Sequence, residues 1–87
     1  MFKIKDTGGE TIIQFDENGE WEFNITKDGY VELLTQEDLD QGKVEGGTPI
    51  KQYATQSRAM EVIQEVSQAI FNASFGNGPK FYVMPDA

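Results

Sequence analysis

Residues 55–73 read TQSRAMEVIQEVSQAIFNA, and this stretch decides the fold class. Its aliphatic residues recur three or four positions apart, which places their side chains on one face of an α-helix. Thr55 is the expected N-cap, because a threonine hydroxyl accepts a hydrogen bond from a backbone N–H of the first turn. The glycines and proline of residues 76–79 end the helix. The predicted apolar face consists of Ala59, Val62, Ile63, Val66, Ala69, Ile70 and Ala73.

Upstream of this helix, turn signals recur about every ten residues, a spacing typical of a β-meander. They are Gly8-Gly9, Asn18-Gly19, Asp28-Gly29 and Gly46-Gly47. Apolar and polar residues alternate between them, and a period of two indicates strands with one buried face. We expect four antiparallel strands near 2–5, 11–15, 21–26 and 30–34, a short fifth near 50–53 and a last one near 80–84.

These elements predict an α+β fold in which an antiparallel β-meander of four to six short strands packs against one long α-helix in the C-terminal half. The 87 residues form a single domain, residues 1–87. The connection over 35–49 is polar. Its Thr35-Gln36-Glu37-Asp38 segment resembles a capping box and predicts one helical turn.

The chain contains neither histidine nor cysteine, so the commonest general base, the commonest metal ligand and all thiol chemistry are excluded. Ser57, Ser67 and Ser74 have no histidine to activate them. The glycine pairs lack the lysine and the spacing of phosphate-binding loops. Asp16 to Glu20 departs from the calcium-loop pattern, because Gly19 is fourth and Lys27 is twelfth. We therefore expect a non-enzymatic protein with no catalytic, cofactor-binding or metal-binding residues.

The net charge of −8 lies entirely in the first half of the chain. Residues 1–48 carry four lysines and twelve acidic residues, whereas residues 49–87 carry three basic and three acidic ones. Direct binding to nucleic acid is not expected, because phosphate contacts require a basic patch. The acidic residues either face a basic partner, mimic nucleic acid or keep the protein in solution. No segment has the apolar length of a membrane span or the form of a signal peptide, and we expect a cytoplasmic location.

Several apolar residues alternate out of phase with the predicted core. If Ile13 and Phe15 point inward, Ile12 points outward, and the same argument turns Tyr30 and Leu34 outward. On the helix, Met60 and Phe71 flank the apolar face. Such residues are ordinary surface residues, part of a contact surface, or covered by a sheet that curls over them. The predicted interaction surface comprises Ile12, Glu20, Glu22, Tyr30, Glu32, Leu34 and Tyr82.

The C-terminal part carries a pattern of its own. Tyr53 and Thr55 precede Arg58, Ala59 and an aliphatic helix, and the segment ends on Phe81-Tyr82-Val83-Met84-Pro85-Asp86. Over residues 50–86 this resembles small uncharacterised proteins of phages, prophages and integrative elements of Gram-positive bacteria. The resemblance implies a mobile-element origin, and it carries over no functional residue.

We expect an accessory protein that acts through a binding surface and associates with itself or with a protein partner. One alternative is a phage counter-defence inhibitor that sets an acidic face, including Asp28, against a basic host protein. Another is an oligomeric binder of a small ligand such as a nucleotide, with a pocket near the 35–49 connection.

Overall fold

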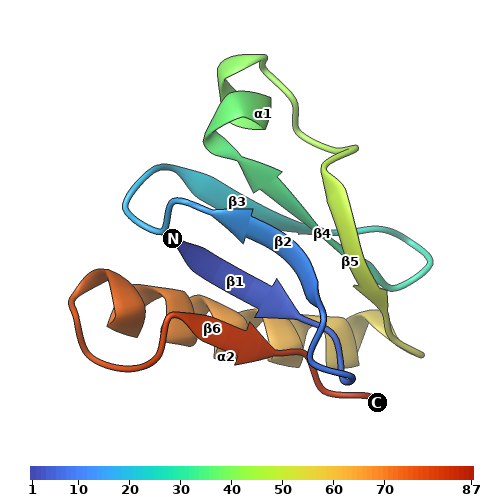
Figure 1. The fold of residues 1–87 in the computed structure, drawn as a ribbon. Helices are drawn as coiled ribbons and strands as arrows, with labels where there is room; N and C mark the ends of the chain where they lie inside the picture. Colours follow the sequence, from blue (N-terminus) through green and yellow to red (C-terminus); the bar gives the residue numbers. More distant parts are fainter.

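The computed structural model describes residues 1–87 and contains six strands and two helices (Figure 1). The α+β class and the long helix in the C-terminal half are confirmed, and the element limits differ from the expected ones by at most two residues. The strands are β1 (Phe2–Lys5), β2 (Thr11–Phe15), β3 (Trp21–Ile25), β4 (Tyr30–Thr35), β5 (Thr48–Gln52) and β6 (Phe81–Val83). The helices are α1 (Gln36–Asp40) and α2 (Gln56–Ser74).

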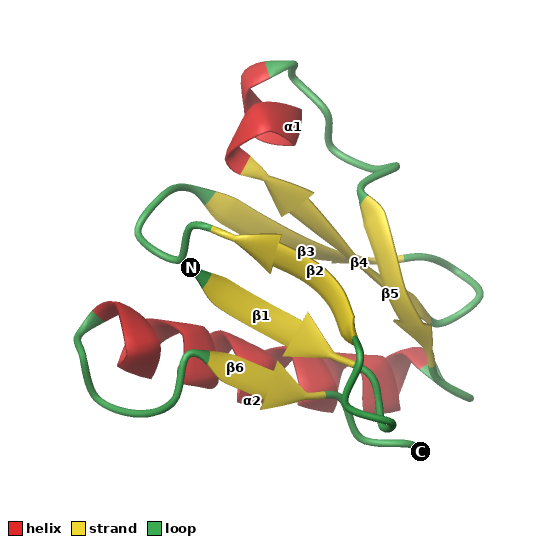
Figure 2. Cartoon of the chain, in the orientation of Figure 1, coloured by secondary structure: helices red, strands yellow, loops and turns green.

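The strands divide into two three-stranded sheets, of order β2-β1-β6 and β3-β4-β5 (Figure 2). The pairs β1–β2, β3–β4 and β4–β5 are antiparallel, as expected of a meander. The meander is interrupted between β2 and β3, which do not pair. The last strand, β6, pairs in parallel with the first, β1. Strands from the two ends of the sequence therefore share one sheet, and both β3 and β6 are edge strands.

Turn geometry explains where the meander breaks. Two turns are closed by a backbone hydrogen bond across the hairpin. Asp6 N–H donates to Glu10 O and Thr26 N–H donates to Tyr30 O, both at 2.9 Å. Gly9 and Gly29, the last residues of these two turns, have positive φ, which a hairpin turn of this kind requires. Gly19 does not have positive φ, and the N–H of Glu20 donates to the side chain of Gln36 instead. The chain therefore leaves the first sheet after residue 16 and starts the second.

Helix α2 packs against strands of both sheets. It contacts β3, β4 and β6, while β2 approaches β5 on the other side. The helix begins as predicted, with Thr55 Oγ1 accepting from Arg58 N at 3.0 Å. Five of the seven predicted helix core residues are fully or almost fully buried, and Ile63 and Ala69 are partly buried. The sheets contribute Phe2, Ile4, Val31 and Leu33 to the same core. Each such aliphatic side chain stabilises the fold by about 1.5–3 kcal/mol.

The outer face of the second sheet is covered by the chain between α1 and β5. Glu32 accepts hydrogen bonds from Asn24 Nδ2 at 2.7 Å and from the backbone N–H of Gly46 at 3.0 Å. Gly47 lies so close to Leu33 that a Cβ at this position would collide with the Leu33 carbonyl oxygen. Leu34 is consequently only 1% exposed and Glu32 only 8%. The prediction that these two side chains lie on an open surface is wrong, because the connection folds back over them.

Two other predicted surface residues are half-buried. The register of β1 against β2 shifts after Ile4, and this bulge turns the strand so that both Ile12 and Ile13 pack against the core. Tyr82 points toward α2 and is also partly buried there. Neither Ile12 nor Tyr82 is therefore a freely projecting surface residue. Neither helix combines the length and the apolar character that crossing a bilayer requires.

Candidate functional site

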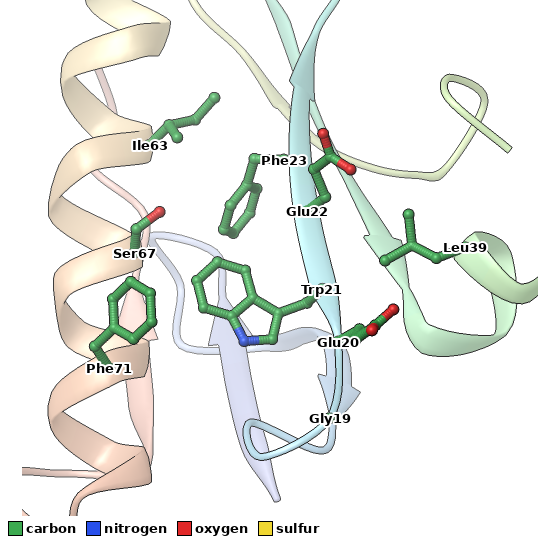
Figure 3. A pocket seen from close by; sticks show the side chains of 9 residues that line it. All are labelled: Gly19, Glu20, Trp21, Glu22, Phe23, Leu39, Ile63, Ser67 and Phe71. Atoms are coloured by element: carbon green, nitrogen blue, oxygen red, sulfur yellow. The ribbon is translucent and has the colours of Figure 1, made fainter.

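The largest hollow on the molecule is an open groove of about 530 Å³ between β3 and α2 (Figure 3). We call it the β3 groove. Trp21 and Phe23 project from β3 toward the helix, and Ile63, Ser67 and Phe71 face them from α2. The full lining is Gly19, Glu20, Trp21, Glu22, Phe23, Leu39, Ile63, Ser67 and Phe71. More than half of these residues are apolar, as in most binding sites.

Aromatic rings form the wall of the groove. The ring centroid of Trp21 lies 5.3 Å from that of Phe71 and 5.8 Å from that of Phe23. These separations are in the range of favourable aromatic pairs. Phe71 is nonetheless 50% exposed, and no hydrogen bond within the protein uses the indole N–H of Trp21. Exposed aromatic rings of this kind are the residues that most often dominate binding energy.

The main chain of β3 offers unused hydrogen-bonding groups along the groove. Because Thr26 N–H donates to Tyr30 O, the even-numbered residues of β3 pair with β4. The N–H and C=O groups of Trp21, Phe23 and Ile25 therefore point away from β4, on the side where the sheet ends. An edge strand with free donors and acceptors is a template for one more strand.

Carboxylates line the side of the groove that faces α1. Glu20 and Glu22 are exposed there, and Glu20 N–H donates to Gln36 Oε1 at 2.8 Å. This bond fixes the start of β3 to α1. The groove therefore combines an apolar wall with an acidic rim.

Helix α1 is fixed by the capping box predicted from the sequence. Thr35 N–H donates to Asp38 Oδ2 at 3.0 Å, and the Thr35 hydroxyl donates to the same oxygen at 3.2 Å. The backbone N–H of Thr35 is the main reason why the pKa of the Asp38 carboxyl is lowered, with Lys43 contributing as well. Asp38 therefore stays ionised and holds α1 beside the groove.

The groove carries few polar side chains. Its polar side chains are two carboxylates and Ser67, and no basic group lies within it to activate the hydroxyl. No group of three or more aspartates or glutamates is arranged to hold a metal ion. What the groove offers a ligand is apolar area, negative charge and backbone hydrogen bonds.

The predicted interaction residues do not form one surface. Glu20 and Glu22 line the β3 groove, whereas Tyr30 is exposed at the start of β4 and takes no part in it. The remaining four are buried or half-buried. Trp21 and Phe23 are partly buried against the core, and both also face the groove. Phe71, flanking the apolar face of the helix, was the one sequence signal for this site, because an aromatic residue there is only half covered.

No protein-family model, curated protein or solved structure matches the chain. The resemblance to phage and mobile-element proteins therefore stays a prediction.

Proposed function

We propose that this domain is a non-enzymatic binding protein that accepts an extended segment of a protein partner as an added antiparallel strand along β3. The observation that carries the proposal is the coincidence of three features at one place. The unused main-chain groups of Trp21, Phe23 and Ile25 lie beside an acidic rim and a wall of aromatic rings, of which Phe71 is exposed. Main-chain pairing would supply affinity, and alternate side chains would supply specificity.

The groove predicts the composition of the segment. In an added antiparallel strand, alternate side chains fall on the face of Trp21 and Phe71, and these are expected to be apolar. The intervening side chains fall on the face of Glu22, and these are expected to be basic. This is the chemistry of the basic partner anticipated from the charge distribution. Glu20 and Glu22 serve it directly, whereas Glu32 is already engaged by Asn24 and Gly46.

A synthetic peptide in which valine alternates with lysine tests the proposal. We expect the amide signals of Trp21, Phe23 and Ile25 to shift in NMR titration and to become protected from hydrogen exchange. A matched peptide with glutamate in place of lysine should bind at least about tenfold more weakly. In the protein, Phe71→Ala should weaken binding by about tenfold or more, while Val44→Ala, at an 81% exposed position outside the groove, should not. Peptide binding that leaves the β3 amides unchanged would contradict the proposal.

A further inference from the structure

A second free edge lies on the other sheet, at β6. Lys3 N–H donates to Lys80 O at 3.0 Å, and Met84 N–H donates to Lys5 O at 2.9 Å. The even-numbered residues of β6 therefore face β1, and the main-chain groups of Phe81 and Val83 point away from it. No strand pairs with them on that side.

The side chains at this edge are apolar, as the β3 groove requires on its aromatic face, and basic residues lie next to them. Phe81 is 44% exposed and Val83 is 43% exposed, and in register they lie beside Lys3 and Lys5. Lys5 Nζ lies 4.9 Å from the centroid of the Phe81 ring. Lys80, also exposed, precedes the strand. In a chain of net charge −8, three of seven basic residues thus gather around one apolar edge strand.

We propose that the strand bound by the β3 groove is β6 of a second copy of this chain. This inference rests on the function proposed above and names its partner. In antiparallel pairing, residues that exchange hydrogen bonds have their side chains on the same face. Phe81 and Val83 of one copy would therefore lie on the face of Trp21 and Phe23 of the other, over the exposed ring of Phe71.

Charge favours this pairing over the two symmetric ones. Lys80 of the incoming strand, whose Nζ also lies 3.3 Å from Glu17 Oε2 of its own copy, falls on the opposite face, where Glu20 and Glu22 project from the receiving copy. Pairing two β3 edges would bring these carboxylates close together, and pairing two β6 edges would bring the lysines close together. Repulsion between like charges disfavours both arrangements. The contact is thus head-to-tail. Such a contact leaves one free β3 groove and one free β6 edge, so copies add until a ring closes or a fibre grows.

Two variants separate these arrangements. The groove variant is Phe71→Lys, and the strand variant is Phe81→Glu with Val83→Glu. All three side chains are about half exposed, and the new glutamates would lie beside Lys3 and Lys5. Val44→Lys is the matched control for loss of an exposed apolar side chain. Circular dichroism melting first establishes that each variant is folded.

Sedimentation velocity then measures association at protein concentrations up to about 1 mM. We expect wild type and Val44→Lys to form species larger than a dimer as concentration rises. Each of the two variants alone should associate at least about tenfold more weakly. An equimolar mixture of them should form a one-to-one dimer, because the mixture contains one intact groove and one intact strand.

The other outcomes overturn the inference in different ways. Self-association of the strand variant alone would indicate a β3–β3 contact, and self-association of the groove variant alone would indicate a β6–β6 contact. A mixture that stays monomeric, or a monomeric wild type, would refute head-to-tail pairing. If the wild type is monomeric while the valine–lysine peptide binds along β3, only the identity of the partner is wrong. If the peptide also fails, the proposed function is wrong as well.

Discussion

The hydroxyl of Tyr82 in β6 donates a hydrogen bond to Glu65 Oε2 in α2 at 2.9 Å. This contact joins the edge of the first sheet to the helix. Burial, with the hydrogen bond and the negative charge of Glu65, raises the pKa of Tyr82 from 10.0 to about 12. The folded state therefore holds the phenolic proton more tightly than the unfolded chain does.

This shift predicts a loss of stability at alkaline pH. Because the folded pKa is the higher one, the stabilisation is complete below about pH 10 and is lost as the pH rises toward about 12. Tyr82→Phe should lower the free energy of unfolding by about 0.5–1.5 kcal/mol at neutral pH and make the alkaline loss shallower. Urea unfolding at a series of pH values measures both. Tyr30→Phe, at an exposed tyrosine whose hydroxyl makes no hydrogen bond, is the control, and an equal effect in both variants would contradict the assignment.

Gly29 is a position where the backbone admits no side chain. Its φ is +81°, its carbonyl accepts from Tyr53 N at 2.9 Å, and an added Cβ would collide with the Tyr53 carbonyl oxygen. Gly29→Ala should therefore lower the free energy of unfolding by about 3 kcal/mol. Gly9 has a similar φ of +86° but open space around it, so Gly9→Ala should cost only about 1 kcal/mol. Equal losses in urea unfolding would show that the collision is relieved without cost.

Glu17 predicts a sensitivity to acid. Burial alone would raise the pKa of its carboxyl, but its own backbone N–H and the positive charges of Lys80 and the N-terminus outweigh burial and lower the pKa from 4.5. Lys80 Nζ forms an ion pair with Oε2 at 3.3 Å, and Oε2 has no hydrogen-bond partner. Since the folded pKa is the lower one, the stabilisation is present above about pH 4.5 and is lost as the pH falls through the folded value.

Glu17→Gln should accordingly flatten the acid side of the stability profile. Thermal melts from neutral pH downward measure the slope, and Glu10→Gln, at an exposed carboxylate without an ion pair, should leave it unchanged. A slope as steep in Glu17→Gln as in wild type would assign the acid sensitivity to another group.

Glu32 holds the connection between α1 and β5 against the sheet. Glu32→Ala removes the acceptor for Gly46 N–H and leaves the amide of Asn24 without its partner. We expect faster hydrogen exchange at Gly46 and a loss of about 2 kcal/mol. Glu22→Ala, at the exposed carboxylate on the same face of the sheet, should change neither quantity by much. Unaltered exchange at Gly46 would show that other contacts hold the connection in place.

Local sequence signals predicted the helices and strands, whereas contacts between residues distant in sequence determined where the sheet breaks. The period-two segments, the Asp28-Gly29 turn and the Thr55 cap each depend on neighbouring residues, and each lies where expected. Asn18-Gly19 carries the same hairpin signal as Asp28-Gly29, yet the sheet breaks there, because Gln36, distant in sequence, binds Glu20.

The candidate site was harder to predict for the same reason. Glu20 and Glu22 were expected at an interaction surface, and they line the β3 groove. Leu34 was expected there too, but it is buried beneath the connection between α1 and β5. The path of that connection depends on the close approach of Gly47 to Leu33. The role of Trp21 depends on β3 being an edge strand. Alternation along a strand tells which side chains share a face, but it does not tell which strands lie at the edge of a sheet.

The parallel pairing of β1 with β6 has a consequence for biosynthesis. Because β1 is translated before β6, it cannot complete its sheet until β6 has been made, so Phe2 and Ile4 lack part of their cover while the intervening residues are synthesised. The β3–β4 hairpin and α2 involve nearer neighbours and form sooner. A nascent chain stalled before residue 80 would thus expose the unpaired edge and apolar side chains of β1 to chaperones and proteases.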